Sequence, residues 1–247
     1  MNEPIRIEHG KRVVSIFLNR PERRNALSFR LLARLSDILS SEIRDDTAAV
    51  IVSGVDGCFS AGADLAELTG TLEDLGLDDA IEEVTQKIRG LPVPVIAAID
   101  GPCLGGAFDL ALSCDHRIAS KNAFFQVPAT RLGLLYNPRS VIRMRQLLGR
   151  DAVFSLLVLG ERLDAHAAQR AGIVSRIVEG ASYEAALELA QASLENIRSA
   201  VDASKRLLNA ADGIDIDYGE WEELRRELLS SPERKAAIDG AKKRRGY

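Results

Sequence analysis

The sequence has 247 residues, of which 46% are hydrophobic and 28% are charged, and this composition excludes disordered, collagen-like and coiled-coil proteins. Its 32 basic and 36 acidic side chains give a net charge of −4, which argues against a general nucleic-acid binder because such proteins need a dominant basic field. Uncharged runs are far shorter than the roughly 20 residues of a membrane helix. The first ten residues carry charges and no apolar signal region, so we expect a cytoplasmic protein.

Short apolar strands alternate with helices through the first half of the chain. Strands are predicted at residues 5–8, 13–18, 48–52, 95–99, 115–119 and near 124–125. Helices are predicted at residues 28–44, with Ser28 as N-cap, at 79–89 and from Gly105 to Leu112. This alternation indicates an α/β fold with parallel strand pairing.

From Pro138 onward the strand pattern almost disappears. Only residues 173–178 still indicate a strand. Helical spacing covers residues 140–148, 152–159, 181–209, 218–229 and 233–245. The sequence therefore predicts an α/β part followed by a helical C-terminal part.

Several common sites lack their signatures. Cys58, Cys103 and Cys114 are odd in number and show no paired metal-ligand spacing, so we expect neither a disulfide framework nor a metal site. The chain has no phosphate-loop, zinc-protease or serine-hydrolase motif.

Two turns of small residues follow predicted strands, at residues 59–65 and 100–109. Such turns bring backbone N–H groups to the positive end of a helix dipole, where they can stabilise a developing oxyanion. Each turn carries an acid, Asp64 and Asp109. Taken alone, each turn is better explained by tight backbone packing than by an oxyanion site.

The sequence resembles the crotonase superfamily, the enoyl-CoA hydratase/isomerase family, over nearly its whole length. The similar segments are residues 19–28, 59–65, 101–115, 126–133 and 165–174. The resemblance implies a spiral of ββα units in an acyl-CoA-binding core at residues 1–190. It also implies a helical trimerisation region at residues 191–247 and a homotrimer or dimer of trimers.

The resemblance also assigns roles to individual residues. The amides of Ala63 and Gly106 would hold the thioester carbonyl of an acyl-CoA. The remaining positions would contact coenzyme A, which is part of the substrate rather than a separate cofactor: Ala61 and Asp64 at the adenine, Arg23 and Arg24 along its path, and Lys242 at a phosphate. Lys242 also fits a solvated last helical turn that complements the helix dipole.

Two positions differ from the family's hydratases, which use two glutamates. The first position is Asp109, whose side chain is roughly 1 Å shorter, and misplacement of that size can cost about 10² in rate. The second is Ala129, which cannot transfer a proton. General acid–base catalysis contributes about 10²–10⁴, so both differences argue against efficient hydration.

Tyr136 and Asn137 resemble the corresponding segment of methylmalonyl-CoA decarboxylases of the same superfamily, although those enzymes carry histidine where this chain has Ala63. Loss of CO₂ generates the enolate without a base. We therefore expect decarboxylation of a malonyl-type thioester, with Tyr136 orienting the carboxylate or enolate and Asp109 positioning a water or a side chain. The alternatives are an enoyl-CoA hydratase/isomerase of fatty-acid metabolism and a non-catalytic acyl-CoA-binding protein.

Overall fold

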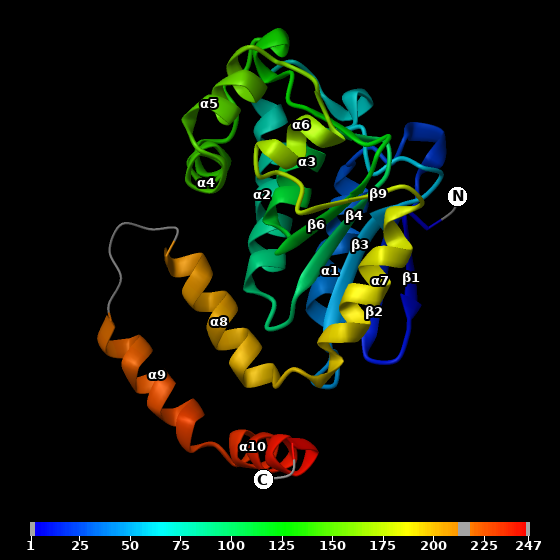
Figure 1. Cartoon of the computed structure of the whole chain (residues 1–247). Coiled ribbons are helices and arrows are strands. Elements are labelled where there is room, and N and C mark those ends of the chain that lie inside the picture. Colours follow the sequence, from blue (N-terminus) through cyan, green and yellow to red (C-terminus); the bar gives the residue numbers. More distant parts are fainter. Residues whose placement is uncertain (1–2, 212–217, 246–247) are drawn as a thin grey trace.

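The computed structural model describes residues 3–211 and 218–245, and a six-stranded sheet forms its centre (Figure 1). The order of its strands is β1-β2-β3-β4-β6-β9. Only β1 and β2 pair antiparallel; the other neighbours are parallel. The strands of this sheet are β1 (Ile5–His9), β2 (Val13–Leu18), β3 (Ala49–Gly54), β4 (Val95–Ile99), β6 (His116–Ser120) and β9 (Arg176–Val178). The strands β1 and β2 form a hairpin, and the expected parallel pairing is confirmed.

The described residues also form a smaller sheet and ten helices. The order of the small sheet is β5-β7-β8, with strands β5 (Pro102–Leu104), β7 (Phe124–Gln126) and β8 (Leu163–Asp164). The helices of the described residues are α1 (Phe29–Ser41), α2 (Leu75–Gly90), α3 (Gly106–Ser113), α4 (Pro138–Leu148), α5 (Arg150–Val153), α6 (Ala165–Arg170), α7 (Ser182–Ala192), α8 (Arg198–Ala211), α9 (Tyr218–Ser230) and α10 (Pro232–Arg245).

Both faces of the large sheet are covered, as its continuous apolar strands require. Along β3, Val50 and Val52 belong to the core shared with α1, α2 and α3. Ile51 points the other way and packs with the small side chains of α7, including Ala186 and Ala190. Because neighbouring strand residues face opposite sides, one strand supplies both cores.

Two expected helices have different bounds in the structure: α1 ends at Ser41 instead of residue 44, and α2 begins earlier than expected. Ser28 does cap α1, since its hydroxyl accepts a hydrogen bond from the Leu31 amide at 3.2 Å. The helix α2 begins at Leu75 instead of residue 79, because a 3-10 turn at Leu72–Asp74 leads directly into it. Leu77, Ile81 and Val84 of α2 are buried and belong to the main core.

The prediction of one helix over residues 181–209 is wrong. The structure has two helices, α7 and α8, separated by a 3-10 turn at Ser193–Glu195 and by extended backbone at Asn196. The break lets α7 lie on the sheet while α8 runs along a different surface. Arg198 holds this change of direction by donating to the backbone oxygens of Arg44 and Thr47, at 3.0 and 2.6 Å.

One buried lysine attaches α8 to the core. The Nζ of Lys205 lies 2.8 Å from Oδ2 of Asp115 and donates to the backbone oxygens of Ile88 and Val93, both at 3.1 Å. Beyond α8, the helices α9 and α10 run away from the large sheet (Figure 1). Within residues 3–211 and 218–245, no helix has the length and apolar character needed to cross a membrane.

Candidate active site

The two turns of small residues lie side by side in the structure. The Ser60 amide donates to the Pro102 oxygen at 3.0 Å, and the Leu104 amide donates to the Ser60 oxygen at 3.1 Å. A Cβ atom on Gly62 would lie 2.5 Å from the Leu104 oxygen, closer than real Cβ contacts allow. Gly62 also has a φ of 87°, so its backbone conformation favours glycine as well. The structure therefore brings the two expected donor turns together.

The amide of Ala63 points away from the strand-like segment beside it. The Leu27 amide donates to the Gly62 oxygen at 2.8 Å, and the Asp64 amide donates to the Leu27 oxygen at 3.0 Å. In such a parallel bridge the residue between the two bonded groups directs its own N–H to the opposite side. Among the described residues, none accepts a hydrogen bond from the Ala63 amide.

Gly106 occupies the first position of α3, after Gly105 with a φ of 51°. The first N–H groups of a helix have no intrahelical acceptor, and they form the positive end of the helix dipole. Within the described part of the chain, the Gly106 amide also has no acceptor. A Cβ atom at Gly106 would lie 2.7 Å from Cδ1 of Ile81 on α2, so a side chain there would force Ile81 to move.

Asp109 lies one turn into α3, and its carboxylate is fully engaged by charged and polar partners. Oδ1 accepts from Nη2 of Arg143 at 2.8 Å, and Oδ2 accepts from the Ser140 hydroxyl. Arg143 also pairs with Glu82 of α2 at 3.2 Å. Burial raises the pKa of Asp109, while Arg143 and Ser140 oppose that rise. This buried cluster of Glu82, Asp109, Ser140 and Arg143, called the ionic floor below, joins α2, α3 and α4.

The position that follows Pro128 offers no proton-transferring group. Ala129 is buried and begins a 3-10 turn at Ala129–Leu132. Its methyl group belongs to the main core. Together with the pairing of Asp109, this leaves both hydratase-type carboxylate positions without a free carboxylate.

Tyr136 contacts the turn that precedes Gly106 directly. Its hydroxyl donates to the Gly105 oxygen at 3.0 Å. Burial, together with the carboxylates of Asp109 and Asp78, holds the pKa of Tyr136 well above its usual value, so the hydroxyl keeps its proton. The next residue, Asn137, caps α4 through Oδ1, which accepts from the Arg139 amide at 3.0 Å. Its Nδ2 donates to Oδ2 of Asp78 at 2.8 Å.

The sequence analysis did not identify Asp78, Glu82, Ser140 or Arg143. Asp78 lies three residues before the buried Ile81 and four residues before the buried Glu82, a weak signal that charged side chains share this face of α2. Arg143 lies 34 residues from Asp109 along the chain, and no local pattern links the two.

Of the residues expected at coenzyme A, three lie on adjoining turns: Arg23, Arg24 and Ala61. Arg23 and Arg24 are exposed, and the Ala61 amide donates to the Arg24 oxygen at 2.9 Å. The buried Asn25 fixes their turn, since its Nδ2 donates to the oxygens of Val55 and Cys58 at 3.0 and 2.6 Å.

Asp64 and Lys242 differ from those three. The Asp64 carboxylate pairs with Arg20 at 2.8 Å. Burial raises the pKa of Asp64, but the hydrogen bonds from Arg20 and the Ala66 amide outweigh it and the pKa is lowered. Lys242 is exposed on α10, which lies far from α3 in Figure 1, so a single chain does not bring it to this site.

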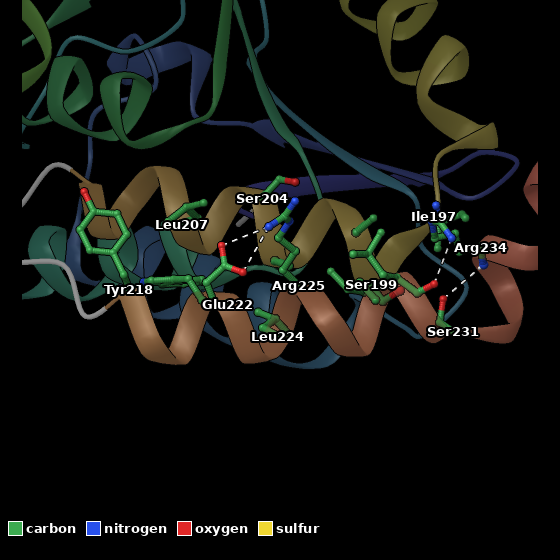
Figure 2. A pocket seen from close by; sticks show the side chains of 15 residues that line it. Ile197, Ser199, Ser204, Leu207, Tyr218, Glu222, Leu224, Arg225, Ser231 and Arg234 are labelled. Carbon is green, nitrogen blue, oxygen red and sulfur yellow. Dashed lines mark hydrogen bonds and ion pairs between the residues drawn. The ribbon is translucent and has the colours of Figure 1, made fainter.

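A separate apolar cavity of about 430 Å³ lies between α8 and α9 (Figure 2). Leu207 from α8 and Leu224 from α9 contribute to its walls, and Tyr218 lies at one end. It shares no residue with the two turns or with the ionic floor.

Comparison with known proteins places this geometry in a family context. Residues 8–239 match the family model described as enoyl-CoA hydratase/isomerase. A probable enoyl-CoA hydratase of Mycobacterium bovis is 32% identical, with 89% of this chain and 88% of the relative covered. A short-chain-enoyl-CoA hydratase of Clostridium acetobutylicum is 34% identical, with coverages of 88% and 85%.

Solved structures agree with this match. The crystal structure of a putative enoyl-CoA hydratase/isomerase family protein from Hyphomonas neptunium superimposes with a TM-score of 0.91 at 30% identity. The superposition covers 98% of this chain and 95% of that one. The expected crotonase-type α/β fold with a helical C-terminal region is thus confirmed.

Proposed function

Because the chain belongs to the enoyl-CoA hydratase/isomerase family, we propose that it binds an acyl-CoA thioester and stabilises its enolate with the amides of Ala63 and Gly106. Among the described residues, neither amide has a hydrogen-bond acceptor, and this supports the role. Loss of one such donor typically costs about 10²–10³ in rate, so the pair would contribute most to catalysis. Coenzyme A would enter as part of the substrate, along Arg23, Arg24, Ala61 and Asp64.

The reaction that we propose is decarboxylation of a malonyl-type thioester. The observation that carries it is the state of the two hydratase positions: Asp109 is paired with Arg143, and residue 129 is alanine. Hydration needs carboxylates to position a water and deliver its proton, whereas departure of CO₂ leaves an electron pair on the α-carbon without a base. Tyr136 would hold the turn before Gly106, or turn its hydroxyl from the Gly105 oxygen to the departing carboxylate.

A second candidate is an enoyl-CoA hydratase or isomerase of fatty-acid metabolism, because the relatives carry hydratase names. The alanine at position 129 also fits a third candidate, a non-catalytic acyl-CoA-binding protein.

Mass spectrometry of the purified protein with crotonyl-, 3-enoyl-, malonyl-, methylmalonyl- and ethylmalonyl-CoA separates these candidates. We expect loss of CO₂ from a malonyl-type thioester and no addition of water to crotonyl-CoA. Addition of water or migration of the double bond would establish the second candidate instead. Tight binding without turnover of any thioester would establish the binder, and Tyr136→Phe would then leave affinity unchanged.

We also propose that the protein is cytoplasmic and forms a homotrimer or a dimer of trimers through its C-terminal helices. The cavity between α8 and α9, and exposed apolar residues such as Leu208 and Leu229, support burial of this region against further copies of the chain. Light scattering at several protein concentrations tests the assembly, and a monomer throughout would overturn it.

A further inference from the structure

Besides Glu82 and Asp109 of the ionic floor, a third carboxylate, Asp78, lies close to the turn that precedes Gly106. It is half-buried in the first turn of α2. Its position is three residues before Ile81, whose Cδ1 covers the Cα of Gly106. Residues three apart share one face of a helix, so Asp78 lies on the face of α2 that meets the start of α3.

Residues 136 and 137 fix Asp78 relative to that turn. Tyr136 binds the Gly105 oxygen at 3.0 Å, and Asn137 donates to Oδ2 of Asp78 at 2.8 Å. Two consecutive residues therefore connect Asp78 to the residue that precedes the Gly106 amide. This group of Asp78, Tyr136 and Asn137 is called the polar rim below.

The partners of Asp78 differ from those of Asp109. Asn137 is a neutral amide, so no cation compensates the Asp78 carboxylate among the described residues. Only Oδ2 is bound, and within the described part of the chain Oδ1 has no hydrogen-bond partner. A half-buried carboxyl group with one free oxygen can take up and release a proton.

On the basis of the function proposed above, we propose that Asp78 is the catalytic residue that transfers the proton at the α-carbon of the enolate. The enolate's electron pair forms the new C–H bond, the O–H bond of the Asp78 carboxyl breaks, and water later returns a proton to the carboxylate. After loss of CO₂ this step completes the saturated thioester. Burial raises the pKa of Asp78, with Asp79 and Glu82 adding to the rise and Asn137 opposing it, which favours the protonated acid.

Microscopic reversibility provides a test that does not depend on the acyl group being decarboxylated. A residue that protonates the enolate also removes an α-proton from the saturated product. Wild-type protein in D₂O should therefore exchange the α-protons of acetyl-, propionyl- or butyryl-CoA for deuterium, detected by mass spectrometry.

Asp78→Asn should slow this exchange by about 10²–10⁴, the usual contribution of general acid–base catalysis, with unchanged thioester affinity. Its amide oxygen can still accept the hydrogen bond from Asn137, and circular dichroism verifies its folding. Glu73→Gln, which alters an exposed carboxylate of the 3-10 turn before α2, should exchange like wild type. Asp78→Glu should restore part of the rate because it restores the carboxyl group.

The two proposals fail in different ways. Wild-type exchange that persists in Asp78→Asn would overturn the assignment of Asp78 and leave the enolate mechanism standing. Absence of exchange in the wild type with all three thioesters would overturn the enolate mechanism and this assignment with it.

Discussion

The ionic floor and the polar rim both lie close to the start of α3, and each contains an aspartate. Asp109 in the floor is 1% exposed and pairs with Arg143, while Asp78 in the rim is half-buried and, within the described part of the chain, has the neutral Asn137 as its hydrogen-bond partner. Arg143 opposes the effect of burial on the Asp109 carboxylate, whereas no such cation faces Asp78 among the described residues. The comparison teaches that the two aspartates differ in their partners: Asp109 is tied into the packing of α2, α3 and α4, and the proton transfer that we propose falls to a residue on α2.

The largest effect should come from breaking the floor. Asp109→Ala leaves Arg143 buried without its main partner, and removal of one member of a buried ion pair typically costs about 3–5 kcal/mol of folding stability. Urea unfolding at one fixed protein concentration measures this loss. Asp79→Ala, an exposed carboxylate, should change stability by no more than about 0.5 kcal/mol. If Asp109→Ala behaved like that control, the floor would not be structural.

The pH dependence of α-proton exchange sharpens the same comparison. Asp78 must be ionised to remove a proton, so exchange should rise about tenfold per pH unit below its pKa and level off above it. The raised pKa places this levelling above the usual range of aspartate. The groups around Asp78 are Asp79 and Glu82 on α2 and Tyr136 and Asn137 from the segment before α4; Tyr136 stays protonated in this range. A flat profile between pH 4 and about 8 would contradict the role of Asp78.

A smaller effect should follow from altering the rim's amide. Asn137→Ala removes the cap of α4, which typically costs about 0.5–2 kcal/mol, and it removes the hydrogen bond that lowers the pKa of Asp78. The levelling of the exchange profile should therefore move to higher pH.

Asn137→Asp is the matched control for this change. It keeps a capping oxygen and places a second carboxylate beside Asp78, so stability should hold while the profile moves further upward. An unchanged profile in both variants would show that Asn137 does not tune Asp78.

Local patterns in the sequence were sufficient for most of the fold. The apolar strand at residues 95–99 and the helix after Ser28 depend on neighbours within a few positions, and both were predicted. The break between α7 and α8 was missed because helical spacing continues through residues 193–197. Lys205 binds residues 88, 93 and 115, and these distant contacts set the direction of α8.

The candidate site also has some features that were expected from the sequence and others that depend on contacts between distant residues. The resemblance to the family implied that the turns with Ala63 and Gly106 act together, and the structure has small residues at their points of close approach. The partners of Asp109 could not, because Glu82 and Arg143 meet it only through the packing of α2 and α4 on α3. Asp78 was missed for the same reason, since its proximity to the turn depends on Asn137, 59 residues away.

The parallel bridge between Leu27 and Ala63 has a consequence for how such a protein can acquire new reactions. Backbone groups of residues 62 and 64 hold the bridge, so the donor at position 63 is secured without any contribution from its own side chain. Ala63 is partly exposed, and a longer side chain there would add a new functional group while the amide kept its orientation. Position 63 is thus a point at which a single substitution can add a side-chain group while the orientation of the backbone amide is retained.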